Sequence, residues 1–207
     1  MSLFITFEGI EGSGKSTQMK KLAARLEAGG HAVETYREPG GTELGEKLRT
    51  LILDDTHIAM SPGGETLLLM ASRRELIETR IRPALDAGRT VLCDRFVDST
   101  IAYQGHGRGL GEEWVRRLFD VTCGGFYPHL TLLLDLPVKA GLRRLRRPAV
   151  DRFEREQEAF HENVRQGFLS IASREPDRVK IIPAGGADAD VFERILQCLK
   201  QRFGTSF

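Results

Sequence analysis

A glycine-rich run near the amino terminus has the residue types and the spacing of a phosphate-binding loop. The run from Gly9 to Ser16, GIEGSGKS, fits the pattern G-x-x-x-x-G-K-S/T at every fixed position. Glycines let the backbone turn so that successive N–H groups face one phosphate, and a following helix adds the positive end of its dipole. Lys15 can then reach the β- and γ-phosphates, and the Ser16 hydroxyl can complete the shell of a Mg²⁺ ion. The run therefore predicts a nucleoside triphosphate site at Gly9, Ile10, Glu11, Gly12, Ser13, Gly14, Lys15, Ser16 and Thr17.

Three further segments carry side chains that could bind a second anionic ligand. Residues 36–42 read YREPGGT and residues 94–105 read DRFVDSTIAYQG, each at the end of a β-type run. Residues 67–74, LLLMASRR, form a helical pattern that ends in two arginines. Because the carboxyl ends of parallel strands meet at one edge of a sheet, we expect the first two segments to lie beside the phosphate loop. Together the three segments predict an acceptor pocket.

The phosphate loop alone does not define what happens to the γ-phosphate. A GTPase switch needs an N-K-x-D loop, and the one asparagine in the chain, Asn163, lies in the unrelated run HENVR. A small-molecule kinase fits the length of 207 residues, whereas a mechanical ATPase would normally need more chain. Two alternatives stay open: a related nucleoside or nucleoside-monophosphate kinase that acts on another base, and a nucleotide-gated regulator that binds without phosphorylating.

Short β-type runs alternate with helical patterns along the chain. Nearly continuous apolar runs such as LFITF and TLLL suit strands that are buried on both faces, which indicates a parallel sheet covered by helices. We therefore expect a three-layer α/β fold with five parallel strands. The expected strands are 3–7, 32–36, 90–94, 131–135 and 179–183, and the expected helices are 15–28, 42–53, 65–80, 97–104, 111–123, 137–145, 153–174 and 188–202.

Composition and charge exclude several classes of protein. Thirty Lys and Arg against 29 Asp and Glu leave a net charge of +1, which argues against bulk nucleic acid or an anionic membrane as the main partner. The apolar runs are far shorter than the roughly 20 residues that cross a bilayer. Three widely spaced cysteines form neither a disulfide framework nor a metal pair, which favours a cytoplasmic location. We expect residues 1–207 to form one domain.

An arginine-rich segment follows the expected helix 137–145. Five of the residues from 142 to 152 are arginines, and Pro148 interrupts them. A proline ends a helix and the charge density resists burial, so we predict a mobile lid over about 143–153. The alternative interpretation is a solvated helix end.

The chain resembles the bacterial thymidylate kinases. Four motifs occur in the order and at the spacing of that family: FEGIEGSGKST, REPGGT, a helix ending in ASRR, and DRFVDSTIAYQG. The likeness runs from Phe4 to about Phe168, and the four motifs together are far more specific than the phosphate loop alone. The resemblance implies a P-loop kinase fold and an enzyme that is typically a homodimer. It also implies that the enzyme uses ATP and Mg²⁺ to convert dTMP to dTDP for dTTP synthesis.

The resemblance also implies roles for individual residues. Glu11 and Asp94 would help Ser16 to hold Mg²⁺, and Glu11 would also lie near the acceptor's sugar. The expected dTMP site is Glu11, Glu38, Arg49, Leu69, Arg73, Arg95, Thr100, Tyr103 and Gln104, with Arg95 on the phosphate, Arg73, Thr100 and Gln104 on the polar edge of thymine, and Tyr103 beneath the deoxyribose.

Some of these assignments have alternatives within the sequence. Asp135 also ends an apolar run, but Asp94 is favoured because an arginine and a polar run follow it. Tyr103 could be an ordinary core residue. Arg74 and Glu78 have the i,i+4 spacing of a surface ion pair, so Arg74 is left outside the site. Trp114 is expected to pack in the interior.

Two features differ from relatives in the family. Gly12 and Ser13 carry no cation, unlike relatives with an arginine in the phosphate loop, and the resemblance implies a lid arginine instead. Arg152 is the best match for it and Arg147 the second; Lys15, Arg95 and Arg152 are thus the expected catalytic residues. Leu69 occupies the position where the family commonly has a phenylalanine that stacks on thymine.

Overall fold

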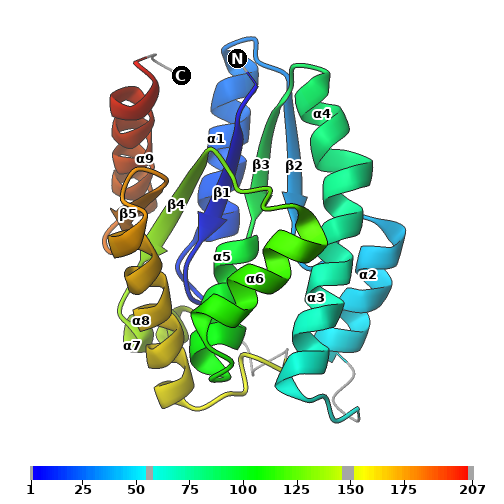
Figure 1. Cartoon of the computed structure of the whole chain (residues 1–207). Coiled ribbons are helices and arrows are strands. Elements are labelled where there is room, and N and C mark those ends of the chain that lie inside the picture. The colour runs from blue at the N-terminus through cyan, green and yellow to red at the C-terminus, as the bar shows by residue number, and fades with distance from the viewer. Residues whose placement is uncertain (1, 55–57, 146–151, 205–207) are drawn as a thin grey trace.

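Five parallel strands form a sheet in the part of the chain that the structure describes, residues 2–54, 58–145 and 152–204. The structure is a computed structural model, and its sheet has the order β2-β3-β1-β4-β5 (Figure 1). The predicted strands are confirmed, each within one residue at either end. The strands are β1 (Phe4–Glu8), β2 (Val33–Arg37), β3 (Thr90–Asp94), β4 (Leu130–Asp135) and β5 (Val179–Pro183).

Helices cover both faces of this sheet (Figure 1). Phe4 of β1 packs in a core with α3, α6 and α8, whereas Ile5, the next residue, packs on the other side with α1 and α9. Adjacent side chains of a strand point to opposite faces, so a run of apolar residues supplies two cores. The helices are α1 (Lys15–Ala28), α2 (Glu43–Arg49), α3 (Pro62–Leu76), α4 (Arg82–Asp86), α5 (Val97–Thr100), α6 (Glu112–Cys123), α7 (Val138–Arg144), α8 (Glu158–Arg174) and α9 (Asp188–Phe203).

Helix boundaries differ from the sequence expectations in three ways, the first being that α3 begins at Pro62 rather than at residue 65. Wider, π-type turns at Thr50–Asp54, Ile77–Ile81 and Ile101–Gly107 extend α2, join α3 to α4 and extend α5. The helix expected from residue 153 begins at Glu158, because the preceding residues form turns. No described helix has both the length and the apolar character needed to span a bilayer.

The order of the strands determines where the polar segments meet. β1 lies between β3 and β4, and Phe7 of β1 is opposite Asp94 of β3. The loop that follows β1 and the loop that follows β3 therefore open at the same edge of the sheet. This edge is where open α/β sheets bind their ligands.

Candidate active site

The loop between β1 and α1 has backbone angles that only glycine adopts readily. Gly9, Gly12 and Gly14 have φ values of 136°, 71° and 93°. A β-carbon at Gly9 would lie 2.5 Å from the carbonyl oxygen of Leu134, and one at Gly12 would lie 2.3 Å from that of Gly141. Close packing against two neighbouring backbones thus requires glycine at both positions. The glycines fix a loop from which α1 begins at Lys15.

Lys15 is folded over this loop. Its Nζ donates hydrogen bonds to the carbonyl oxygens of Gly9 and Ile10 at 3.0 and 2.9 Å. Burial, together with the nearby Arg95 guanidinium, lowers the pKa of Lys15 to about 8. An incoming phosphate would supply the negative charge that this ammonium group lacks.

Ser16 and Asp94 bring a hydroxyl and a carboxylate together at the same edge. Ser16 Oγ donates a short hydrogen bond to Asp94 Oδ2. Hydroxyl and carboxylate oxygens, completed by water and phosphate oxygens, are the ligands that Mg²⁺ prefers. Asp135, the alternative carboxylate, is engaged elsewhere, since Arg165 donates to both of its oxygens at 2.8 and 2.9 Å. The donor set at Ser16 and Asp94 therefore fits a magnesium ion.

Arg95, Glu11 and Tyr103 form a second polar group in front of the loop. Arg95 Nη2 donates to Glu11 Oε1 at 2.7 Å, and the Tyr103 hydroxyl lies 2.6 Å from both Glu11 oxygens. Burial alone would raise the pKa of Glu11, but Arg95 and Lys15 hold it below its ordinary value. Glu11 is thus an ionised carboxylate beside two cations. Arg95 itself has the left-handed φ of 70°, which aims its side chain back toward the phosphate loop, where Nη1 reaches the Gly9 carbonyl at 3.2 Å.

Arg73 is a buried arginine on α3, with 2% of its side chain exposed. Its Nε donates to Glu38 Oε2 at 2.7 Å and its Nη2 donates to Thr100 Oγ1 at 2.9 Å. The three residues come from α3, from the segment after β2 and from α5, so the fold joins segments that are distant in the sequence. Arg74 instead faces outward and pairs with Glu78 at 3.3 Å, as its spacing predicts.

A cavity of about 340 Å³ connects these groups. Its volume lies within the range of small-molecule sites. Of the predicted ATP site, Gly12 and Lys15 line it, whereas Gly9, Ile10, Ser13, Gly14 and Thr17 do not. Every residue that the sequence assigned to the acceptor or the metal also lines it: Glu11, Ser16, Glu38, Arg49, Leu69, Arg73, Asp94, Arg95, Thr100, Tyr103 and Gln104.

Arg152 does not line this cavity. Its Nη2 donates to the carbonyl oxygen of Met60 at 3.4 Å, and its Nη1 lies 3.6 Å from Glu65 Oε2. Arg147, the second choice for the catalytic arginine, and most of the predicted lid lie outside the described residues. The catalytic role of Arg152 stays a prediction.

Sequence reasoning missed Phe153, which lines the cavity next to Arg152. Its ring meets the ring of Tyr103 edge to face, with centroids 5.5 Å apart. The Tyr103 ring is therefore packed on one side while its hydroxyl bonds to Glu11. A single phenylalanine among charged residues gives no periodic signal, so only the folded chain places it here.

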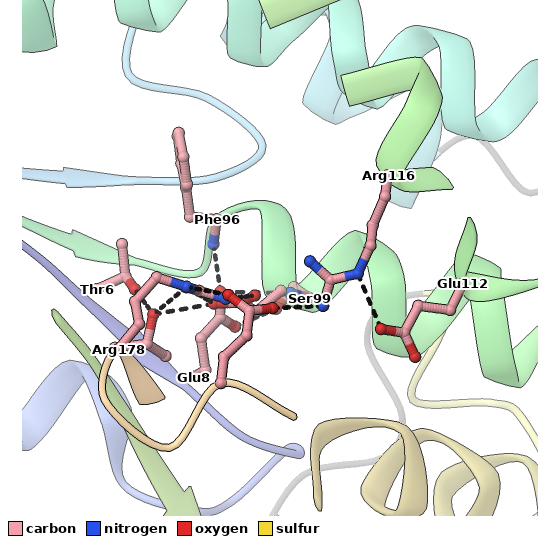
Figure 2. Close-up of polar contacts among 10 residues, drawn as sticks. Thr6, Glu8, Phe96, Ser99, Glu112, Arg116 and Arg178 are labelled. Carbon is pink, nitrogen blue, oxygen red and sulfur yellow. Dashed lines mark hydrogen bonds and ion pairs between the residues drawn. The ribbon is translucent and has the colours of Figure 1, made fainter. Parts of the chain in front are cut away.

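Glu8, at the end of β1, is a second residue that the sequence did not single out. Its Oε1 accepts hydrogen bonds from the backbone N–H groups of Phe96 and Ser99 at 2.7 and 3.3 Å, and its Oε2 bonds to Ser99 Oγ (Figure 2). Burial and the neighbouring Asp98 raise the pKa of Glu8 to about 8. Ser99 Oγ also accepts from Arg95 at 3.1 Å, so Glu8 supports the Arg95 side chain from below.

The raised pKa of Glu8 predicts that the folded chain loses stability as the pH rises from 4.5 to about 8. Below pH 4.5 the carboxyl is protonated whether the chain is folded or not; as pH rises toward about 8, only the folded chain keeps the proton, so the free energy of unfolding falls. Glu8→Gln mimics the protonated form, so its free energy of unfolding should not show this fall. The fall in the wild type should amount to a few kcal/mol, at about 1.4 kcal/mol per pKa unit. Urea unfolding at pH 5, 7 and 9 measures it.

A matched carboxylate provides the control for this prediction. Glu43 lies on α2 with 87% of its side chain exposed, so Glu43→Gln should follow the wild-type pH dependence. Parallel curves for wild type and Glu8→Gln from pH 5 to 9 would contradict a protonated Glu8.

Comparisons with known proteins agree on one family. Residues 7–195 match the thymidylate kinase family. The chain is 48% identical to the thymidylate kinase of Syntrophotalea carbinolica over 202 residues, covering 94% of each chain, and 47% identical to that of Deinococcus radiodurans, covering 97% of each. It also superposes on the crystal structure of thymidylate kinase from Ehrlichia chaffeensis with a TM-score of 0.78 and 36% identity, covering 96% of this chain and 98% of that one. With its fold, motifs and length all matched, the chain belongs to the thymidylate kinase family.

Proposed function

We propose that this chain transfers the γ-phosphate of ATP to dTMP and so forms dTDP, a step toward dTTP. The observation that carries the proposal is that Lys15 of the phosphate loop, Arg95 and the buried Arg73 all line one cavity. Such a cavity holds two phosphates close together at one end and a base at the other. The whole chain acts as one domain in this proposal.

The phosphate loop is the ATP end of the site. Its N–H groups and Lys15 bind the β- and γ-phosphates of ATP. Ser16, Asp94 and Glu11 are the residues that would hold Mg²⁺, directly or through water. A Mg²⁺ ion held by these residues would supply positive charge against the negative charge that develops during transfer.

The acceptor occupies the rest of the cavity. Arg95 binds the phosphate of dTMP, while Glu38 and Arg49 line the opposite wall. Arg73 and Thr100 donate to the polar edge of thymine, which Leu69 covers. Tyr103, fixed by Glu11 and Phe153, lies beneath the deoxyribose and leaves no room for a 2′-hydroxyl.

Transfer then requires positioning rather than proton abstraction. The attacking atom is a phosphate oxygen that already carries negative charge, so no general base is needed. Lys15 and Arg95 approach the reacting phosphates from two sides and draw their oxygens into line. Preorganised cations of this kind act on charge that is greatest in the transition state.

Arg152 is the third cation that we assign to the transition state. Because the phosphate loop has no arginine, Arg152 must exchange Glu65 and the Met60 carbonyl for phosphate oxygens when both nucleotides are bound. Arg152→Ala should lower kcat by roughly 10²–10³-fold with little change in dTMP affinity. Steady-state kinetics measure this effect, with Arg155→Ala, which changes an exposed arginine, as the control variant. Unchanged kcat would show that Arg152 serves only Glu65, and weaker dTMP binding at full kcat would make it a substrate contact.

Leu69 gives a prediction about affinity. Its side chain lines the cavity and is 8% exposed. Stacking a base on an aromatic ring contributes about 1–3 kcal/mol, part of which leucine supplies through burial. Leu69→Phe should therefore tighten dTMP binding several-fold, measured by calorimetric titration with thermal melts as the control. A lower melting temperature with unchanged dTMP affinity would place Leu69 in the core and the thymine elsewhere.

We also propose that the enzyme is a cytoplasmic homodimer. Trp114, expected to be internal, is 42% exposed, and Val121 on the same helix is 84% exposed. Leu67 of the neighbouring α3 is 54% exposed, and exposed apolar side chains on two helices that pack together favour contact with a second copy. Light scattering after size exclusion should give twice the mass of 23.1 kDa, and a monomer at micromolar concentration would contradict the dimer.

A substrate screen tests the proposed function against its alternatives. The purified protein is assayed for ADP release with ATP, Mg²⁺ and each common nucleoside and nucleoside monophosphate in turn. We expect dTMP to give the highest kcat/KM. Preference for another base would identify a different nucleotide kinase, and ATP binding without acceptor-dependent ADP release would identify a regulator.

A further inference from the structure

Glu65, in the first turn of α3, is a buried carboxylate that no step of the proposed reaction uses. Its side chain is 1% exposed, and its Oε1 accepts a hydrogen bond of 2.9 Å from Gln104 Nε2. Gln104 lines the cavity, at the end that contains Arg73 and Thr100, whereas Glu65 does not line it. Glu65 is thus placed to influence a bound base through Gln104.

Two guanidinium groups flank the Glu65 carboxylate. Arg108 Nε lies 3.5 Å from Oε1, and Arg152 Nη1 lies 3.6 Å from Oε2. Arg108 is itself fixed by an ion pair with Glu156. Arg108 stays beside Glu65 when Arg152 turns to phosphate, and a carboxylate paired with a guanidinium offers Gln104 acceptor oxygens only.

This arrangement fixes which end of the Gln104 amide faces the cavity. The NH₂ group must point to Glu65, because a reversed amide would set its oxygen against a carboxylate oxygen. Gln104 is 1% exposed, so bulk water cannot compensate for that repulsion. The carbonyl oxygen is therefore the polar end that Gln104 offers to a ligand.

Pyrimidine bases differ in their response to such an oxygen. Thymine and uracil present an N3–H donor beside the O4 acceptor, whereas cytosine presents an N3 acceptor beside an amino donor. Arg73, a donor in the same end of the cavity, suits O4. An acceptor oxygen from Gln104 then suits N3–H and repels the unprotonated N3 of cytosine.

We propose that Glu65 is a positioning residue for base specificity: it holds Gln104 with its oxygen toward the cavity, so that the site accepts thymine and rejects cytosine. The inference rests on the proposed function, because it takes a pyrimidine deoxynucleotide as the acceptor. Glu65 touches no substrate and acts only through the orientation of Gln104.

The test compares three acceptors in one variant. In Glu65→Gln the amide at position 65 can present either end, so Gln104 is free to reverse and offer its NH₂ group to cytosine. The ratio of kcat/KM for dTMP to that for dCMP should fall at least about tenfold. The ratio for dTMP to dUMP should change less than about twofold, since both bases present the same polar edge. Each ratio is internal to one protein, so a general loss of stability or turnover cancels.

Two further variants keep the test decisive. Glu156→Gln removes the other carboxylate of Arg108 without touching Gln104, and should leave both ratios at the wild-type value. Glu65→Asp keeps the charge beside both arginines but withdraws it from Gln104, and provides the same comparison if Glu65→Gln does not fold. An unchanged dTMP to dCMP ratio in the folded variants would overturn the inference, as would an equal fall in both ratios. A wild-type protein that does not phosphorylate dTMP would overturn the proposed function instead.

Discussion

Lys15→Ala should lower kcat/KM for phosphoryl transfer by at least about 10³-fold, the upper end of what removal of one preorganised charge costs. Lys15 is 8% exposed and, among the described residues, its Nζ bonds to its own loop, so its ammonium group is held ready for phosphate. Its loss leaves the γ-phosphate without the ammonium charge at the start of α1. The measurement is ADP release with dTMP at saturating ATP.

The fold should survive this substitution. Burial lowers the pKa of Lys15, which shows that the folded chain without nucleotide stabilises its charge less well than water does. Melting temperature should therefore stay the same or rise. Lys20→Ala, an exposed lysine on the same helix, is the matched control and should keep wild-type turnover. Turnover above a few per cent of wild type in Lys15→Ala would contradict the assignment.

Arg95→Ala should cost roughly 10²–10³-fold in kcat/KM for dTMP, with a higher KM for dTMP and little change for ATP. Arg95 lies between Glu11 and the Gly9 carbonyl, where it can hold the acceptor phosphate beside the loop. Alanine also carries a β-carbon, so the backbone strain at φ 70° is the same in both proteins. Initial rates at varied dTMP and varied ATP separate the two effects.

Two comparisons define the role of Arg95. Arg95→Lys keeps the charge but loses the forked donor, so it should recover only part of the activity. Arg89 precedes the first residue of β3, whereas Arg95 follows its last residue. Arg89→Ala removes an arginine that pairs with Glu34 and should leave dTMP kinetics unchanged. If Arg95→Ala raised KM for ATP and left dTMP unaffected, Arg95 would belong to the donor site.

The sequence predicted the sheet well because two-sided burial leaves a clear signal. Residues 4, 5 and 7 alternate between two cores, so apolar side chains are needed on both faces of the strand. The phosphate loop was equally clear, since Gly9 and Gly12 meet neighbouring backbones that exclude any side chain. Where one constraint, such as two-sided burial or close backbone packing, acts on adjacent residues, the sequence alone predicts the structure.

The supporting residues left no such pattern. Glu8 bonds to Phe96 and Ser99, which lie 88 and 91 positions away, so its role depends on the pairing of β1 with β3. Glu65 looked like an ordinary acidic residue in a first helical turn, where the helix dipole favours negative charge. Arg152 was placed by its motif, but its contact with Glu65 joins two segments that the sequence treats separately. Long-range polar partners are what sequence reasoning could not supply.

The most direct test follows the γ-phosphate itself. ATP labelled with ¹⁸O at the three terminal γ-oxygens is incubated with dTMP, Mg²⁺ and the purified protein, and the masses of the products are measured by mass spectrometry. Direct transfer predicts dTDP whose β-phosphate carries all three labelled oxygens, formed in equal amount with ADP. Label that appears in inorganic phosphate while dTMP stays unchanged would show an ATPase and would contradict the proposed transfer.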